Sequence, residues 1–252
     1  MNSIRYIIGI LFLTFICSAM QLRAQATHLV DDDRDGAHAW AANIDANGNA
    51  HYNSGAEIVF FLDHDCTISN KMYIENGTKI TLNLNNCTLT SKTGGFNLFE
   101  IKEGSSLTIV DNSSAKGGAI NGGAFYHTAA GIYVNGGTLN LVSGTIKNFK
   151  QNFASGDSGY GCGVYINECG VFNMSGGVIT ECGFNLDNHY GSDNSLYSGV
   201  NQHGGAVYID KYPKPGTTVY GTFNFSGGII ENCTAYRGAA VYVDAPKADP
   251  PA

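Results

Sequence analysis

Apolar and polar residues alternate along most of the chain after residue 57, in short segments that are separated by glycine-containing turns. One ten-residue pattern occurs three times, at 137–146, 170–179 and 221–230, and in each copy two apolar residues flank an asparagine. Alternation with a period of two predicts β-strands, and Gly-Gly, Asn-Gly and Ser-Gly pairs predict the turns between them. The pattern therefore predicts an all-β chain made of similar strands.

Repetition of this kind indicates an array in which each unit stacks on its neighbours. Stacking brings equivalent residues together, and the apolar ones then form three buried columns: Leu139/Phe172/Phe223, Leu141/Met174/Phe225 and Ile146/Ile179/Ile230. Columns of this type fill the interior of a parallel β-helix, a solenoid in which every winding pairs with the windings above and below it. The asparagines point outward and are expected to form a hydrogen-bonded ladder: Asn140, Asn173 and Asn224.

The N-terminal residues are predicted to lie outside this fold. One arginine, an apolar run at 7–16 and a small-x-small site at 24–26 are typical of a secretory signal peptide. The apolar run is shorter than the ~20 residues of a transmembrane helix, so we expect no transmembrane segment in the mature chain. The sequence thus predicts a signal peptide (1–26), a short N-terminal cap or leader (27–56), the β-helix (57–244) and a Pro-rich tail (245–252).

Composition argues against nucleic acid as a partner but does not decide whether the cysteines form disulfides. Only 14% of the residues are charged and the net charge is −7, which argues against nucleic acid because its binding needs a basic face. Removal of Cys17 with the signal peptide leaves six cysteines, an even number that permits disulfides in an exported protein. Cys66 matches Cys87 and Cys182 matches Cys233, as either disulfides or stacked free thiols.

Several segments resemble proteins with a known fold: 78–84 (TKITLNL), 104–109 (GSSLTI), 117–120 (GGAI), 225–232 (FSGGIIEN) and 238–242 (GAAVY). They are similar to the pectate-lyase-like (pectin-lyase-like) superfamily of right-handed parallel β-helices. They also resemble the Gly-rich repeats of Gram-negative surface proteins, including polymorphic outer-membrane adhesins. The resemblance implies a right-handed solenoid and display at a bacterial cell surface or outer membrane.

The residues that carry chemistry in this superfamily are mostly missing. Its lyases use arginines and calcium, whereas the mature chain has only Arg34 and Arg237, and the hydrolase motifs do not occur in a matching strand. A pair of carboxylates can hydrolyse a glycosidic bond. The candidates lie in or near two long insertions, where a solvated polar loop explains them equally well: Asp187, Asp193, Asp210, His189 and His203. A polysaccharide lyase or glycoside hydrolase therefore remains the alternative to a non-catalytic module.

One short motif raises the question of a bound metal. Asp31, Asp33 and Asp35 form the Asp-x-Asp-x-Asp-Gly opening of a calcium-binding loop. The twelfth position of that loop is Ala42, where a bidentate glutamate belongs. The segment is therefore either a low-affinity calcium site or an acidic leader, and no other cofactor is expected.

The exposed feature most suited to binding is aromatic. Four blocks at 131–134, 163–166, 206–209 and 240–243 place a tyrosine between two aliphatic residues, so the aliphatic side chains face inward and the tyrosines outward: Tyr133, Tyr165, Tyr208 and Tyr242. Stacked tyrosines offer flat faces to sugar rings or contact area to a protein, although they also pack against one another. The sequence predicts a secreted or surface-displayed adhesin that binds an extracellular glycan or a host or cell-surface protein.

Overall fold

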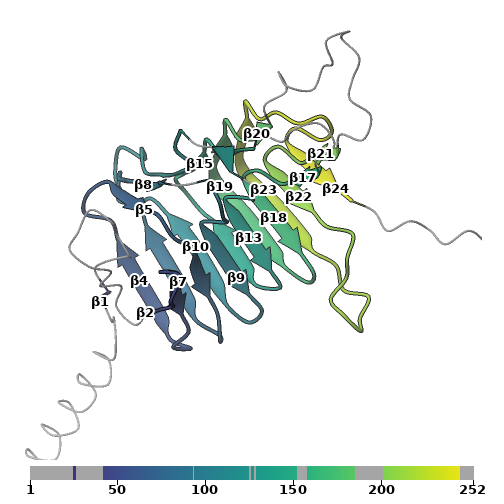
Figure 1. The fold of residues 1–252 in the computed structure, drawn as a ribbon. Coiled ribbons are helices and arrows are strands. Elements are labelled where there is room, and N and C mark those ends of the chain that lie inside the picture. The colour runs from purple at the N-terminus through teal and green to yellow at the C-terminus, as the bar shows by residue number, and fades with distance from the viewer. Residues whose placement is uncertain are drawn as a thin grey trace, which may run out of the picture.

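The computed structural model describes residues 25–26, 42–92, 94–124, 126–127, 129–151, 158–184 and 201–244. Within these ranges the protein is all-β, has no helix, and arranges its strands in curled, largely parallel sheets (Figure 1). Since the described part contains no helix, it also contains none that is long and apolar enough to cross a membrane.

The largest sheet, sheet A, has two halves that are joined by its longest strands. The first half contains β1 (Gln25–Ala26), β4 (Glu57–Phe61), β7 (Lys79–Asn83), β10 (Ser106–Val110) and β14 (Thr138–Leu141). The second half contains β5 (Cys66–Ile68), β8 (Thr88–Ser91), β11 (Ala119–Asn121) and β15 (Thr145–Lys147). Strands β19 (Val171–Thr180) and β23 (Thr222–Glu231) run through both halves.

Three further sheets complete the described structure. Sheet B contains β2 (Ala42–Ile44), β3 (Ala50–Tyr52), β6 (Met72–Ile74), β9 (Phe99–Lys102), β13 (Ile132–Asn135), β18 (Val164–Asn167), β22 (Val207–Ile209) and β24 (Val241–Val243). Sheet C contains β12 (Tyr126–His127), β16 (Lys150–Gln151) and β20 (Gly183–Phe184). Sheet D contains β17 (Ser158–Tyr160) and β21 (Asn201–His203).

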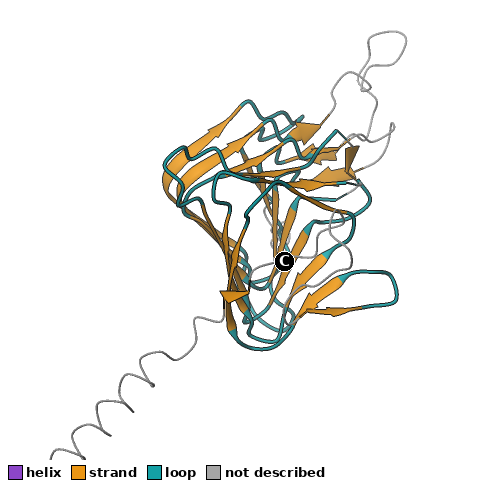
Figure 2. Ribbon diagram, turned by 90° about the vertical axis from the view of Figure 1, so that its left-hand side faces the viewer, coloured by secondary structure: helices purple, strands orange, loops and turns teal. Residues whose placement is uncertain are grey.

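The chain passes through these sheets in a repeating order. It runs through sheet B, then the first and second halves of sheet A, and returns to sheet B beside its own earlier strand. One such passage is called a winding below. Strands of successive windings pair in parallel throughout, and the exception among the described strands is the antiparallel pair β2–β3. In Figure 2 the strands of the different sheets surround a common interior.

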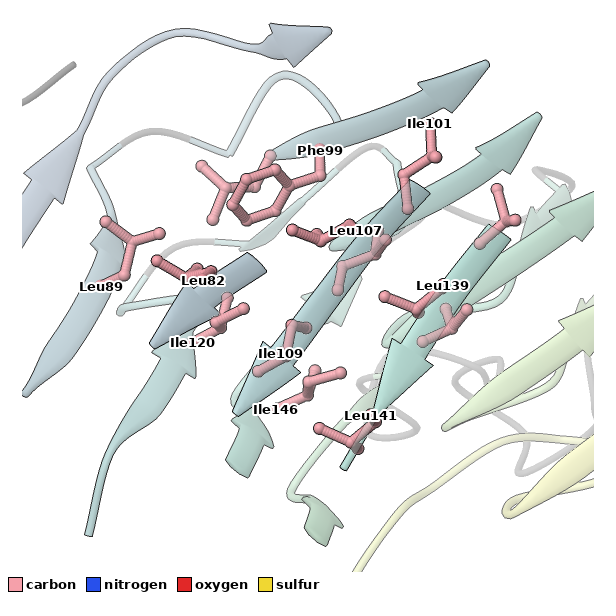
Figure 3. Close-up of a cluster of buried hydrophobic side chains, with 14 of the residues drawn as sticks. Leu82, Leu89, Phe99, Ile101, Leu107, Ile109, Ile120, Leu139, Leu141 and Ile146 are labelled. Carbon is pink, nitrogen blue, oxygen red and sulfur yellow. The ribbon is translucent and has the colours of Figure 1, made fainter. Parts of the chain in front are cut away.

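The predicted alignment of the apolar columns is confirmed, but their burial is incomplete, because in the last described winding Phe223 and Ile230 are only partly buried and Phe225 is exposed. Leu139 pairs with Phe172, which pairs with Phe223, and the register extends back to Leu107 of the winding before. Leu107, Leu139 and Phe172 have no exposed surface. Figure 3 shows the same arrangement in the middle of the stack, where labelled side chains from both halves of sheet A and from β9 meet in one cluster. Each large apolar side chain buried in this way contributes roughly 1.5–3 kcal/mol.

The outer surface of sheet A carries the expected asparagine ladder. Asn224 Nδ2 donates to Asn173 Oδ1 at 2.8 Å, and Asn173 Nδ2 donates to Asn140 Oδ1 at 2.9 Å. Asn140 Nδ2 in turn donates to Thr108 Oγ1 at 3.1 Å. The repeated asparagine is therefore a cross-strand connector between windings and not an isolated turn residue.

The parallel strands begin earlier than residue 57, where the alternation predicted them to begin. Strand β3 already pairs in parallel with β6, and its three residues alternate between the interior and the outer face. A three-residue alternation is too short to stand out in the sequence. The predicted signal peptide, the segment 27–41 and the tail 245–252 lie outside the described residues, apart from Gln25 and Ala26 of β1.

The predicted alignment of Cys66 with Cys87 is wrong. Cys66 pairs with Leu89, two residues further along β8, and Ile68 pairs with Ser91. Leu89 pairs with Ile120 on its other side, so Cys66 occupies the first position of this apolar column. Burial in the column sets the register, and the local similarity of the two Cys-Thr-aliphatic segments does not. All six described cysteines are free thiols.

The last described winding leaves apolar surface uncovered. Strand β23 pairs with β19, and β24 pairs with β22, each on one side only among the described strands. Phe225 is 54% exposed and Val243 is 62% exposed, although their partners in the preceding winding, Met174 and Ile209, are buried. Both residues align with buried residues of the interior columns, but no described strand covers them on the other side.

Candidate functional site

The candidate site lies on the outer face of sheet B, where one side chain from each winding stands above the next. The strand registers align seven residues, which we call the outer column: His51, Tyr73, Glu100, Tyr133, Tyr165, Tyr208 and Tyr242. The predicted alignment of the four tyrosines is confirmed. His51, Tyr73 and Glu100 were missed, although Met72-Tyr73-Ile74 has the same aliphatic–Tyr–aliphatic pattern as the four blocks.

The aromatic rings of this column contact one another between windings. The ring centroids of Tyr133 and Tyr165 are 5.1 Å apart, those of Tyr165 and Tyr208 are 5.2 Å apart, and those of Tyr208 and Tyr242 are 5.7 Å apart. These separations lie within the range of favourable aromatic pairs. The four tyrosines from Tyr133 to Tyr242 therefore fix each other's orientation.

A second line of side chains, two residues further along each strand, runs beside the outer column. We call it the polar column: Glu75, Lys102, Asn135, Asn167, Asp210 and Asp244. Three of the tyrosine hydroxyls hydrogen-bond to the polar residue of the following winding. Asn167 Nδ2 donates to the Tyr133 hydroxyl at 2.9 Å, Tyr165 donates to Asp210, and Tyr208 donates to Asp244 at 2.9 Å.

Burial and these hydrogen bonds keep the hydroxyls protonated. Burial raises the pKa of Tyr165, and its hydrogen bond to the Asp210 carboxylate raises that pKa further. The pKa of Tyr208 is raised by burial and then by Asp244, and the pKa of Tyr133 is raised chiefly by burial. A hydroxyl that donates to a carboxylate would have to give up that bond on ionisation. The tyrosine part of the outer column is therefore uncharged, and it lies beside the charged and amide groups of the polar column.

The N-terminal part of the outer column is more strongly charged. Lys71 Nζ lies 3.0 Å from Glu100 Oε2, and Lys102 Nζ lies 3.2 Å from Glu75 Oε2. Both ammonium groups also stand 4.9 Å from the centroid of the Tyr73 ring. Burial opposes ionisation of Glu75, but hydrogen bonds from His51 and Lys102 outweigh it and hold the pKa of this carboxyl below its usual value. The charges here are paired.

The expectation that all four predicted tyrosines are exposed is wrong for Tyr208, which is only 2% exposed. The Tyr160 ring lies 4.9 Å from the Tyr208 ring and packs against it. Gly161 and Gly204 make the corners before β18 and β22 with positive φ, and a Cβ at either position would lie within 3 Å of the Tyr208 Cβ. Tyr133 and Tyr165 are partly exposed, as are Tyr73 and Tyr242.

His203 packs against Tyr242, the last tyrosine of the outer column. Its ring stacks on Tyr242 at a centroid distance of 4.3 Å, it is 7% exposed, and neither ring nitrogen has a hydrogen-bond partner among the described residues. Burial lowers the pKa of His203, Arg237 and Lys211 lower it further, and Asp244 opposes them. The neutral imidazole is therefore the form that fits the folded protein.

Because the pKa of His203 is lower in the folded chain than the ~6.5 of an unfolded chain, its contribution to stability is complete above pH 6.5. That contribution is lost as the pH falls from 6.5 through the folded value. We expect the free energy of unfolding, measured by urea denaturation, to fall between pH 7.5 and pH 5. We expect a smaller fall in His203→Phe, in which every other histidine is retained. An equal pH dependence in the two proteins would contradict this assignment.

The insertion at 210–221 borders the polar column. Its turn is closed by Lys214 N, which donates to Val219 O at 2.9 Å, and the Lys214 ammonium pairs with Glu103 beyond the end of β9. Tyr212 in this insertion is 60% exposed, more than any tyrosine of the outer column. The sequence did not single out Tyr212, because it lies outside the repeated blocks.

The predicted catalytic residues do not form a set among the described residues. Asp187, His189 and Asp193 lie outside them. Asp210 accepts the Tyr165 hydroxyl, whereas His203 stacks on Tyr242 and has no hydrogen-bond partner in the described part of the chain. The calcium motif at Asp31, Asp33 and Asp35 also lies outside the described residues, and within them no cluster of three potential metal ligands is found.

A scan against protein-family models and searches of curated proteins and of solved structures found no match to this chain. The function must therefore be argued from the outer face of sheet B itself.

Proposed function

We propose that the chain is a secreted or surface-displayed right-handed parallel β-helix of the pectate-lyase-like type that binds extracellular glycans without cleaving them. The parallel pairing of successive windings and the three apolar columns support this fold. The apolar run and the cleavage-site pattern before residue 27 support export.

The observation that carries the binding proposal is the pair Tyr133 and Tyr165. Both tyrosines are partly exposed, lie on adjacent windings with ring centroids 5.1 Å apart, and are held by hydrogen bonds of their hydroxyls with Asn167 and Asp210. Rings that are fixed before a ligand arrives lose little conformational entropy on binding. A pyranose ring presents a flat face of C–H groups that packs on an aromatic ring, and about one such ring fits each strand spacing of ~4.8 Å.

The polar column supplies the other half of the recognition. Asn135 and Asn167 flank the two tyrosines and are only partly buried, so their amide groups lie within the accessible part of the site. Asn167 donates one hydrogen bond to the Tyr133 hydroxyl and keeps a carbonyl oxygen. Amides donate and accept hydrogen bonds, as sugar hydroxyls do. An aromatic surface beside a line of amides suits an uncharged or weakly charged glycan chain that runs across the strands.

The test is a glycan-array screen of the purified chain, followed by calorimetry with the best-bound glycan. We expect Tyr165→Ala to weaken binding about 10-fold, which corresponds to ~1.4 kcal/mol, because it removes one stacking face. Tyr165→Phe keeps the ring and removes only the hydroxyl that bonds Asp210, and it should bind like the wild type. Tyr212→Ala is the matched control for an exposed tyrosine outside the column.

The binding proposal fails if the array gives no bound glycan, or if Tyr165→Ala and Tyr212→Ala bind as tightly as the wild type. A loss in Tyr212→Ala alone would move the site to the insertion at 210–221. Circular dichroism of each variant distinguishes loss of the site from loss of the fold.

Glycoside hydrolysis is the second candidate, and one observation favours it. Asp210 and Asp244 follow the paired residues Ile209 and Val243, so their carboxylates stand on one face a single strand spacing apart. That spacing is close to the ~5 Å between the carboxyl groups of retaining glycosidases. Both carboxylates, however, already accept a tyrosine hydroxyl. Release of reducing ends from the bound glycan, abolished in Asp244→Asn, would establish cleavage in place of simple binding.

A further inference from the structure

Two cysteines lie opposite each other on the last two windings. Thr180 pairs with Glu231, and Gly183 pairs with Thr234, so the register on both sides places Cys182 directly beside Cys233. The backbone N–H of Thr234 donates to the Cys182 carbonyl at 2.9 Å, which fixes the two segments at this point. Neighbouring strands are ~4.8 Å apart, within the range of Cα separations that disulfides span.

The two thiols also lie on the same side of their segments. Cys182 is part of the hydrophobic core, and the Cys233 side chain packs against that core. Cys182 is buried, whereas Cys233 is partly exposed on the last winding and is within reach of a dissolved oxidant. Parallel register, facing side chains and access from one side are the geometric requirements for closing a disulfide.

We infer that Cys182 and Cys233 are a site of oxidative modification and form a disulfide that joins the last two windings. The oxidant is a small-molecule disulfide or the disulfide of a thiol oxidoreductase, which an exported protein meets. This inference does not depend on glycan binding. The structure contains the two cysteines as free thiols, and the disulfide between them is what we infer.

The reaction balances as two successive exchanges. The Cys233 thiolate attacks one sulfur of the oxidant, a Cys233–oxidant S–S bond forms, and the oxidant's S–S bond breaks to release one thiolate. The Cys182 thiolate then attacks Cys233 Sγ, the protein disulfide forms, and the second thiolate leaves. The two cysteine protons pass to the two released thiolates. The protein loses two electrons, and the oxidant gains them.

Cys233 is the attacking residue on electrostatic grounds as well as by exposure. The hydrogen bond from Cys182 lowers the pKa of Cys233, whereas burial raises the pKa of Cys182. A thiolate is the nucleophile in disulfide exchange. Cys233 therefore attacks first, because its thiol has the lower pKa and the greater exposure.

The disulfide would join the last described winding, which has a neighbouring winding on one side only, to the winding before it. The chain between Cys182 and Cys233 includes the insertion at 210–221 and all of β23, whose far side is open among the described residues. Closing a loop of this length removes more freedom from the unfolded chain than closing a short one, which stabilises the folded form. The disulfide would therefore hold the last winding against β19.

A third cysteine makes the experiment specific. Cys162 is fully buried in the same hydrophobic core as Cys182. It has no aligned partner of its own in the two strand registers that flank Cys182. Cys162→Ser is thus the matched control for Cys182→Ser and Cys233→Ser.

The test incubates the folded full chain with oxidised glutathione, blocks the remaining thiols with iodoacetamide and maps the peptides by mass spectrometry. We expect a peptide pair linked through Cys182 and Cys233 in the wild type and in Cys162→Ser, but not in the other two variants. Thermal unfolding of the oxidised wild type should then occur roughly 5–10 °C higher than after reduction, with no such shift in Cys233→Ser.

Two outcomes overturn the inference. One is that the oxidised wild type contains no Cys182–Cys233 peptide. The other is that Cys182 links to Cys162 instead. The peptide map of the wild type alone decides between these results, so the test holds even if a serine variant fails to fold.

Discussion

Replacing Phe172 by alanine is expected to lower the free energy of unfolding by about 3–5 kcal/mol, the range for removing a large aromatic side chain from a closed core. Phe172 has no exposed surface and stacks on Phe223 at a centroid distance of 4.9 Å. It lies in the middle of an apolar column, with Leu139 on its other side. Windings on both sides hold the space open, so the cavity cannot collapse without moving backbone.

The control for this substitution is Phe225→Ala in the following winding. Phe225 is 54% exposed and aligns with Met174 on one side only among the described strands. Its truncation should change stability by less than about 1 kcal/mol, because it leaves no closed cavity. Urea denaturation followed by circular dichroism measures both. Equal losses in the two variants would show that the columns do not form a closed interior around Phe172.

Gly177→Ala is expected to destabilise the protein by about 2–5 kcal/mol, the second large effect. Gly177 has a φ of +74°, a conformation that costs roughly 1–2 kcal/mol for a residue with a Cβ. A Cβ there would also lie 2.7 Å from the Gly144 carbonyl oxygen and 3.0 Å from Leu141 Cγ. Relieving such overlap in a packed region typically adds 1–3 kcal/mol.

Gly77→Ala separates the two contributions. Gly77 has nearly the same φ, +76°, but no heavy atom of the described structure lies within 4 Å of the position that its Cβ would take. We expect a loss of about 1–2 kcal/mol from the backbone conformation alone. The difference between the two variants in chemical denaturation then measures the close approach of windings at Gly177. Identical losses would mean that no such approach exists.

The repeated segments carried most of the correct predictions. Equivalent positions such as Leu139, Phe172 and Phe223 were identified because an inward-facing position is apolar in every winding. The tyrosine alignment followed from the same repetition. Where a segment occurs once, the sequence offered no template, and the predictions were less accurate.

The burial of Tyr208 illustrates that limit. It depends on Tyr160, which comes from a segment without a repeat and reaches the outer face through the corner at Gly161. The register of Cys66 illustrates a second limit. Residues 66–68 resemble 87–89, but Cys66 pairs with Leu89 because this register places it in the apolar column that contains Leu89. Long-range packing decided both cases, and a single sequence does not reveal it.

The unequal covering of the windings has a consequence for how the molecule opens. A strand in the middle of a sheet contacts two neighbours, whereas β23 and β24 at one end of the stack and β1, β2 and β5 at the other have one neighbour each among the described strands. In such a linear assembly stability is roughly a sum of nearest-neighbour terms, so fluctuations that separate strands are easiest at the least supported winding. Thermal opening should therefore begin at these edge strands, and strands with a neighbour on each side, such as β10 and β13, should separate last.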